Sequence, residues 1–541
     1  MTNNKNTYKK ELTGYPSIDK PHERFYRKTP VRDINVNQTI YEMVFNSNKQ
    51  NMTEPALEYM GIIWSFEKLK LETDKAACAF RKSGLIMGDT VLIGMSNSPE
   101  AVVVLLALNK LGVASKWFDV RAGEKDIEDY ANDNKCRFLI AFDLLIPRIN
   151  LILEQTHLER ILIVYPSDSL SKVKQVAYQS LKAERIPQDG KYMRLKEFID
   201  TFNDGTNVDC VPFDQNRPSV MVQSSGTTGK PKTIVHSDLS ATAYAKRIAY
   251  ADMPVEHGKT LLVLLPPWIA YAIGGAIITP LALGVQIILS PTFGPNAIIN
   301  YLGKFTSVCA APFNYRYLKD NYWKLTKKKR DAVGKIECLI SGGDKIPVKE
   351  NMELEKRLGT VLINGYGCNE GWGCLTVNSY LHNKYGTVGI PKYGDTVIAY
   401  DSETQKELPY GESGEICVLT DTMFLYYESN QEETNLVKKL HDDGKVWLHT
   451  GDIGFIDEDG FLTLNGRARR VIVRRAFKIS AYTIEDKICE HPAVKECVAV
   501  EVDDAVEEHV PMAYVVLNDS VVDQSSIKQS ILEKCSSELK E

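Results

Sequence analysis

The segment "QSSGTTGKPK", from Gln223 to Lys232, concentrates glycine, hydroxyl and lysine side chains in ten residues. It follows "SVMVQ" (219–223), which reads as a strand, so the segment is expected at a strand's C-terminal end, where ligands bind in α/β sheets. Glycine lets the backbone approach a phosphate closely, and hydroxyl and ammonium groups add donors and positive charge. The residues expected to bind phosphate oxygens are Ser224, Ser225, Gly226, Thr227, Thr228, Gly229, Lys230 and Lys232.

The spacing of this segment differs from that of a Walker loop. A Walker loop has four residues between its glycine and the Gly-Lys pair, and serine or threonine follows the lysine. Here two residues separate Gly226 from Gly229, and Pro231 follows Lys230. The segment is therefore either a phosphate-binding loop of another type or a flexible polar turn.

Apolar runs that indicate buried strands alternate with helix-like segments on both sides of the loop. A helix is expected over Pro99–Gly112, which has proline near its start and glycine at its end. Alternation of this kind predicts α/β layers with mainly parallel sheets. The expected strands are 90–96, 138–143, 160–166, 259–266 and 285–291.

The sequence changes character beyond Tyr400. The short segments "GEICVLT", "KVWLHTGD" and "GFLTLNGR" predict antiparallel strands, which we expect to form a small barrel. From Gly466 a basic segment leads to "YTIEDKICEHPAVKECVAVEVD", which indicates a helix and then a strand. We therefore place a domain boundary near Arg469, giving domains 1–468 and 469–541.

Composition excludes several classes of function. A chain of 541 residues is too long for one core, and its net charge of −5 does not favour nucleic acid or an anionic membrane as a partner. The eleven cysteines are scattered without a CxxC pair and the N-terminus has no apolar leader, so a cytoplasmic protein with reduced thiols is expected. The uncharged run Thr260–Gly303 is interrupted by proline and glycine, so we expect a buried strand, turn and helix and no integral membrane segment.

Five segments resemble, in order, the motifs of the adenylate-forming superfamily, which includes acyl-CoA synthetases, peptide-synthetase adenylation domains and beetle luciferases. They are "SSGTTGKPK", "SGGDKIP" (341–347), "NGYGCNE" (364–370), "HTGDIGFIDEDGFLTLNGR" (449–467) and "EHPAVKECVAV" (490–500). The resemblance covers about Gly84 to Leu517. It implies an α/β fold with two mainly parallel sheets and a small barrel in the N-terminal domain, followed by a small, truncated α+β domain. It also implies ATP-dependent activation of a carboxylic acid to acyl-AMP, with Mg²⁺, and transfer to coenzyme A.

The resemblance also implies roles for individual residues. Lys232, Glu370 and Asn369 would be catalytic, with Glu370 and Thr227 near the metal and Arg469 at a hinge. ATP or AMP would contact the phosphate loop together with Gly342, Gly343, Asp344, Asn364, Gly365, Tyr366, Gly367, Asp452 and Arg467. Considered singly, Asp452 is better explained as a turn residue, Tyr366 as a core aromatic and Glu370 as a solvated acid. Considered together, in the order of the family's motifs, they favour the nucleotide site.

The acid itself is predicted to be apolar. "PPWIAYAIGGA" (266–276) carries no aspartate to pair with an amino-acid ammonium, whose burial without a partner would be costly. Together with "PKTIVHS" (231–237), this segment resembles the acetyl- and medium-chain acyl-CoA synthetase branch. The residues predicted to line the acyl pocket are Trp268, Ile269, Tyr271, Gly274 and Gly371. The alternative is that the run is only core.

Four features depart from the family's pattern. Asn369 stands where threonine is usual, and Thr233 where glycine is usual. In the third, a basic segment, Arg469 and Arg470 stand where the family has two acidic residues or an acid and a lysine, and Ala476 where it has glycine. The basic residues between Arg467 and Lys478 would either meet coenzyme A phosphates or form a solvated face.

The fourth feature is a missing lysine. No Gly-Lys pair follows Val516, where the resemblance implies a catalytic lysine. The absence of this lysine has three alternative explanations: an incomplete sequence, slow adenylation or lost activity. Two alternative functions also stay open, namely transfer of the acyl group to a carrier protein and a non-catalytic, nucleotide-binding role. The acid and the oligomeric state are not fixed.

Overall fold

The computed structural model describes residues 12–224, 231–344, 346–467, 471–474, 477–504, 508–518 and 524–538. The chain divides into two compact units. Unit 2 comprises Glu23–Asp395 and Leu419–Leu448, and unit 1 comprises Met1–His22, Thr396–Val418 and His449–Glu541.

The first sheet of unit 2 has parallel strands at its centre. Within the described residues it runs β20-β9-β8-β4-β3-β5-β6-β7, and all neighbours from β8 to β7 are parallel, whereas β9 and β20 are antiparallel. The strands are β3 (Thr90–Gly94), β4 (Ala114–Trp117), β5 (Phe138–Phe142), β6 (Arg160–Val164), β7 (Tyr192–Arg194), β8 (Pro218–Gln223), β9 (Thr233–Ser237) and β20 (Tyr426–Tyr427).

The second sheet of unit 2 runs β16-β15-β14-β13-β12-β10-β11-β1-β2 in the part of the chain that the structure describes. Its strands are parallel from β14 to β1 and antiparallel at both edges. They are β1 (Pro55–Tyr59), β2 (Ile62–Ser65), β10 (Thr260–Val263), β11 (Gln286–Leu289), β12 (Ser307–Ala310), β13 (Cys338–Ser341), β14 (Val361–Cys368), β15 (Gly373–Val377) and β16 (Ile390–Pro391).

A layer of buried helices lies between the two sheets. α4 (Pro99–Lys110) and α9 (Asp238–Ala249) contact strands of the first sheet, and the π-helix η4 (Ala272–Ile278) and α10 (Thr279–Ala282) contact the second. α9 also contacts η4 and α10, which closes the layer. α2 (Ile40–Ser47) and α3 (Phe66–Lys82) pack on α4.

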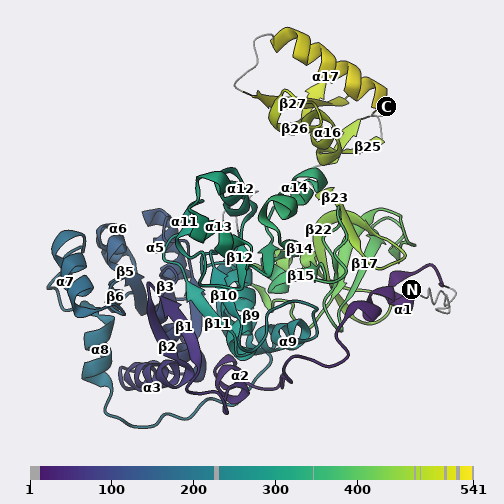
Figure 1. Ribbon diagram of the computed structural model, residues 1–541. Helices are drawn as coiled ribbons and strands as arrows, with labels where there is room; N and C mark the ends of the chain where they lie inside the picture. Colours follow the sequence, from purple (N-terminus) through teal and green to yellow (C-terminus); the bar gives the residue numbers. More distant parts are fainter. Residues whose placement is uncertain are drawn as a thin grey trace. The chain divides into compact units, whose positions relative to one another are not determined.

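Other helices cover the outer faces of the sheets, as Figure 1 shows for the blue segments beside β5 and β6 and the green segments beside β12. The first group is α5 (Glu124–Asp133), α6 (Ile146–Ile152), α7 (Lys172–Leu181) and α8 (Leu195–Phe202). The second group is α11 (Ala297–Asn300), α12 (Pro312–Asp320), α13 (Lys327–Val333) and α14 (Val348–Leu358). Both outer cores are apolar, as the alternation of strand and helix requires.

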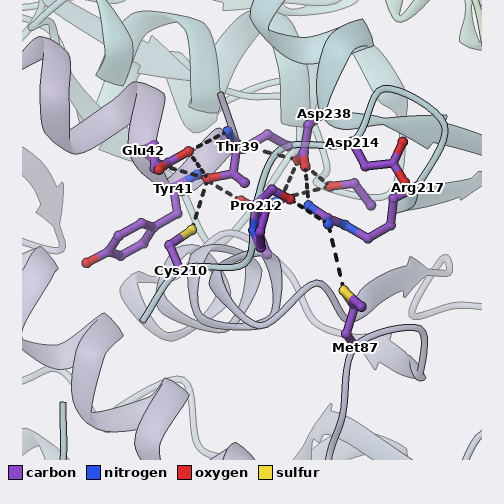
Figure 2. A network of polar contacts seen from close by, with 12 residues as sticks. Thr39, Tyr41, Glu42, Met87, Cys210, Pro212, Asp214, Arg217 and Asp238 are labelled. Carbon is purple, nitrogen blue, oxygen red and sulfur yellow. Dashed lines mark hydrogen bonds and ion pairs between the residues drawn. The ribbon is translucent and has the colours of Figure 1, made fainter. Parts of the chain in front are cut away.

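A buried polar network fastens the helix layer to the first sheet (Figure 2). The Asp238 carboxylate, at the start of α9, accepts hydrogen bonds from Asn109 Nδ2 (2.5 Å) and Ser219 Oγ (3.0 Å) and pairs with Arg217 at 3.2 Å. Burial raises the pKa of Asp238, and these partners oppose that shift. Since α4, β8 and α9 each supply one member, the network fixes where β8 begins.

Unit 1 consists of antiparallel strands and short helices. Its strands are β17 (Thr396–Asp401), β18 (Lys406–Glu407), β19 (Gly414–Leu419), β22 (Val446–Ile456), β23 (Leu462–Arg467), β24 (Val471–Arg474), β25 (Phe477–Ser480), β26 (Val494–Asp504) and β27 (Glu508–Leu517). Its helices include α1 (Pro16–Asp19), α16 (Ala481–Cys489) and α17 (Gln524–Glu538). α16 and α17 share a small apolar core with β26 and β27, formed around Ile484, Ile488 and Ile531.

The predicted α/β class with parallel sheets is confirmed. The predicted helix Pro99–Gly112 corresponds to α4, and the uncharged run forms β10, η4, α10 and β11. Among the described residues no helix is both long enough and apolar enough to span a membrane. The boundary predicted near Arg469 lies outside the described residues and stays a prediction, as do the domain limits.

Candidate active site

The phosphate loop predicted from the sequence joins β8 to β9. These strands are antiparallel and in register at Gln223 and Thr233. Beyond them the Ser224 backbone N–H donates to Lys232 O (2.8 Å), and the Lys232 N–H donates to Ser224 Oγ (2.8 Å). The base of the loop is therefore closed by Ser224 and Lys232. Ser225, Gly226, Thr227, Thr228, Gly229 and Lys230 lie outside the described residues.

The side chain of Lys232 is held by a carboxylate and an aromatic ring. Its Nζ lies 2.7 Å from Glu433 Oε2 and 5.1 Å from the centre of the Tyr427 ring. Glu433 belongs to α15 (Gln431–Val437). The side chains of Lys232 and Glu433 are 28% and 30% exposed, so the pair is accessible to an anionic ligand. The pairing fixes the position of the Lys232 ammonium between Glu433 and Tyr427.

Glu370 lies in a tight 3₁₀ turn, η6 (Asn369–Gly371), directly after β14. Tyr427 Oη donates to Glu370 Oε1 at 2.6 Å, and the Phe424 N–H donates to Glu370 O at 2.7 Å. Burial and the Glu370 carboxylate raise the pKa of Tyr427, which keeps its hydroxyl a donor. Tyr427 thus contacts both Glu370 and Lys232, two of the three residues predicted to be catalytic.

The Asn369 side chain joins three segments. Its Nδ2 donates to Gln223 O (3.2 Å), and its Oδ1 accepts from the Ala270 N–H (3.1 Å). Its backbone oxygen lies 2.8 Å from His236 Nε2. Both ends of the amide are used by backbone groups, and the predicted catalytic role of Asn369 stays a prediction. This cross-link ties the end of β8, where the phosphate loop begins, to the turn that carries Glu370.

Two groups of residues predicted to contact ATP or AMP lie on neighbouring strands: Gly342–Asp344 directly follow β13, and Asn364–Gly367 belong to β14. The two strands are parallel and in register at Ser341 and Asn364, so Gly342–Asp344 and Asn364–Gly367 are neighbours. A Cβ atom at Gly342 would lie 3.5 Å from Gly365 O, and one at Gly367 would collide with the Gly373 carbonyl. Tyr366, before a bulge in β14, is half-buried. The glycines therefore permit close backbone packing here.

The residues predicted to line an acyl pocket surround η4. Trp268 is buried and meets Phe293 edge-on, with ring centres 5.8 Å apart. Tyr271 packs against Gly373, where a Cβ would lie 2.5 Å from the Tyr271 Cα. Ile269 is half-buried, and Gly371 faces Leu375. The structure thus brings Tyr271, Gly274 and the η6 turn together.

Sequence reasoning missed two buried aromatic residues at this place. Trp372 is fully buried, and a Cβ at Gly274 would collide with its Nε1. The His236 ring lies 4.6 Å from the Trp372 ring at 69°. Because its Nε2 must donate to Asn369 O, the neutral ring has its lone pair on Nδ1, and burial lowers its pKa to about 3. Among the described residues, neither His236 Nδ1 nor Trp372 Nε1 has a hydrogen-bond partner.

Two further predicted residues belong to unit 1. Asp452 and Arg467 are opposite one another on β22 and β23, and Arg467 Nε lies 3.1 Å from Asp452 Oδ1. Asp452 is 7% exposed, and its N–H donates to Thr450 Oγ1 at 3.1 Å. The predicted contact of Asp452 and Arg467 with ATP or AMP stays a prediction. Arg469 and Ala476 lie outside the described residues.

Residues 44–428 match the family described as AMP-binding enzyme, and residues 483–541 match the AMP-binding enzyme C-terminal domain. A long-chain-fatty-acid–CoA ligase of Bacillus subtilis (strain 168) is 26% identical over 515 residues, which cover 94% of this chain and 88% of that protein. A 4-coumarate–CoA ligase of Humulus lupulus is 26% identical over 531 residues, covering 95% of this chain and 91% of that protein.

Solved structures share the fold. ATP-bound MatB from Rhodopseudomonas palustris superposes with a TM-score of 0.80 at 21% identity, covering 94% of this chain and 93% of that chain. An anthranilate CoA ligase in complex with anthranoyl-AMP gives a TM-score of 0.78 at 20% identity, covering 94% and 92%. The acetyl- and medium-chain branch favoured by the sequence stays a prediction.

Proposed function

This chain belongs to the AMP-binding enzyme family, and from that premise we propose that it couples ATP to the activation of a carboxylic acid and passes the acyl group to coenzyme A. The two relatives described above are named CoA ligases, and the chain is an enzyme of the AMP-forming acid–thiol ligase type. The identity of the acid and the transfer to coenzyme A belong to the proposal.

One observation carries the proposal: Asn369 links the end of β8, at the base of the phosphate loop, to the turn that carries Glu370, and Tyr427 contacts both Glu370 and Lys232. A carboxylate oxygen of the acid attacks the α-phosphorus of ATP, and the bond to pyrophosphate breaks. Positive charge at Lys232 stabilises the negative charge that develops on the leaving phosphates. In this role Lys232 exchanges its Glu433 partner for a phosphate oxygen.

Glu370 fits the requirements of a Mg²⁺ ligand. Mg²⁺ takes one or two carboxylates together with phosphate oxygens, and when bound it neutralises charge on those oxygens. The Tyr427 hydroxyl donates to one Glu370 oxygen and so fixes the orientation of the carboxylate. The predicted contribution of Thr227 lies outside the described residues.

In the second step the thiol sulfur of coenzyme A attacks the acyl carbonyl carbon. The carbon–oxygen bond to the phosphate breaks, AMP leaves, and the thiol proton is released to solvent. Positioning dominates such reactions, because holding two reactants in place removes much of the entropic barrier. A carrier protein is the alternative acceptor.

The proposal is tested by ATP–pyrophosphate exchange with a panel of aliphatic and aromatic carboxylic acids, followed by thioester formation with coenzyme A. We expect exchange that requires both an acid and Mg²⁺, and loss of exchange in Lys232→Met. Lys304→Met is the matched control, because Lys304 forms a similar ion pair with Glu58 (2.6 Å) elsewhere in unit 2. Absence of exchange with every acid would refute the proposal, and thioester formation only on a carrier protein would replace coenzyme A as the acceptor.

A further inference from the structure

A cleft of about 520 Å³ in unit 2 lies away from the phosphate loop. Its walls come from the residues that precede β8, from α9, from residues 419–425, from β21 (Lys438–Leu440) and from the start of β22. Gln215 and Asn216 precede β8 whereas the phosphate loop follows it, so the cleft and the loop lie at opposite ends of this strand. The described residues that line the cleft include none of those predicted to contact ATP, the acid or the metal. The volume is within the range of small-molecule sites.

The charged side chains that line the cleft are mainly basic. The lining carries an excess of two positive charges, from three basic residues and one acidic residue: Arg247, Lys438, Lys445 and Asp421. Arg247 is already paired, because its Nε lies 2.6 Å from Asp395 Oδ1 and its Nη2 lies 2.9 Å from Asp421 Oδ2. A cleft lined mainly by one sign of charge attracts ligands of the opposite sign.

Lys438 is the cation best placed to meet such a ligand. Its Nζ donates to Phe424 O at 3.0 Å and to Leu425 O at 2.8 Å. An ammonium has three donors, so these two bonds leave one donor and the whole charge for a ligand. Burial lowers the pKa of Lys438, because no carboxylate of the described residues offsets the cost of burying its charge. An anion in the cleft would supply the missing negative charge.

Apolar side chains form another part of the wall. They are Leu239, Met423, Leu425 and Val446. The first three are half-buried and Val446 is exposed, so a ligand can remove more of their surface from water, which is favourable. A ligand that fits the cleft therefore has an apolar body next to its negative charge. A small inorganic anion would meet only the charge.

We propose that this cleft is a second ligand site, which binds an amphiphilic carboxylate. The carboxylate accepts a hydrogen bond from Lys438 Nζ, and the apolar body lies along Leu239, Met423 and Val446. The inference is independent of the proposed function, because it concerns binding away from the phosphate loop and no step of the reaction.

The test is calorimetric titration of the full chain with octanoate, without ATP, so that no acid is consumed. Acetate, which has the charge without the chain, and 1-octanol, which has the chain without the charge, are the matched probes. We expect octanoate to bind at least about tenfold more tightly than either. Lys438→Met should weaken octanoate binding at least about tenfold, since a hydrogen bond to a charged group is lost.

Two further variants separate the cleft from the rest of the surface. Lys439→Met is the control, because Lys439 is the next residue of β21 and does not line the cleft, and it should leave octanoate binding unchanged. Val446→Asp places a negative charge in the cleft at an exposed position and should weaken binding as Lys438→Met does. It serves as the second variant if Lys438→Met does not fold.

Hydrogen exchange of the backbone amides locates the bound acid. Octanoate should slow exchange in residues 419–427 and 438–446 of wild type, and this effect should be absent in Val446→Asp. Three results overturn the inference: no saturable binding of octanoate to wild type, equally tight binding of acetate, or unchanged binding in folded Lys438→Met and Val446→Asp. None of them affects the proposed function, which fails only if no acid supports ATP–pyrophosphate exchange.

Discussion

At the residue scale, Lys232 forms an ion pair with Glu433, and this carboxylate competes with the phosphate oxygen that Lys232 is proposed to bind. Glu433 holds the ammonium at 2.7 Å, and a phosphate oxygen must displace it. An accessible ion pair of this kind contributes roughly 0.2–1 kcal/mol. The pair therefore sets a small energetic cost for binding ATP.

Glu433→Gln should consequently lower KM for ATP, by up to about fivefold, because the competing charge is removed. The measurement is initial-rate kinetics at saturating acid. Glu58→Gln, which frees Lys304 instead, is the control and should leave this KM unchanged. A higher KM in Glu433→Gln would show that Glu433 helps to bind ATP.

His236 gives the fold a pH dependence of known sign. Its folded pKa is about 3, below the usual value near 6.5, because burial disfavours the charged ring. Below pH 6.5 the His236 ring of the unfolded chain takes up a proton that the folded chain does not. The free energy of unfolding is therefore unaffected by this group above pH 6.5 and falls by about 1.4 kcal/mol per pH unit below it.

His236→Gln removes this proton uptake. Between pH 7 and pH 5 the wild type should lose about 2 kcal/mol more stability than the variant, measured by thermal and urea unfolding. The comparison between variants is needed because Glu100, whose pKa burial raises to about 7, acts in the opposite direction over the same range. Equal pH slopes in both proteins would contradict the assignment.

At the element scale, the site depends on how three segments are joined: β8, the residues that precede η4, and the turn η6. Asn369 makes two side-chain hydrogen bonds to the backbones of the first two, and its own residue begins the third. The resemblance to the family's motif identified Asn369 as a site residue. It did not predict the cross-link, because the partners Gln223 and Ala270 are far from Asn369 in the chain.

Asn369→Ala should lower both stability and turnover. Leaving Gln223 O and the Ala270 N–H without partners costs about 1–3 kcal/mol for each buried group. Because a positioning residue acts on geometry and not on affinity, kcat should fall while KM for ATP changes little, which steady-state kinetics resolves. An unchanged kcat in a folded variant would show that the cross-link does not matter for the reaction.

Gly367 is required by the bulge between β14 and β15. A Cβ there would collide with the Gly373 carbonyl, and this collision cannot be relieved by a side-chain movement because the carbonyl belongs to the backbone. Gly367→Ala should therefore destabilise unit 2 by more than about 2 kcal/mol, seen as a lower unfolding temperature. Gly334→Ala is the control, since the nearest atom to its Cβ would be 3.8 Å away. Equal unfolding temperatures would show that the strands can separate without cost.

At the scale of the whole molecule, the sequence predicted what local pattern determines. Apolar runs located β3, β5, β6, β10 and β11, and a proline and a glycine bounded α4. The Lys232–Glu433 ion pair and the His236–Trp372 ring contact could not be predicted, because each joins residues that are far apart in the chain. Glu433 is 201 residues from Lys232. No local signal distinguishes such a glutamate from a solvated helix residue.

The central claim is that a carboxylate of the substrate attacks the α-phosphorus of ATP. It is tested most directly by supplying an acid labelled with ¹⁸O in its carboxylate, using the acid with the highest exchange rate, and analysing the AMP by mass spectrometry. Attack at the α-phosphorus transfers one carboxylate oxygen, so the account predicts AMP that carries one ¹⁸O atom and unlabelled pyrophosphate. Unlabelled AMP, or label in inorganic phosphate with ADP as the product, would contradict it.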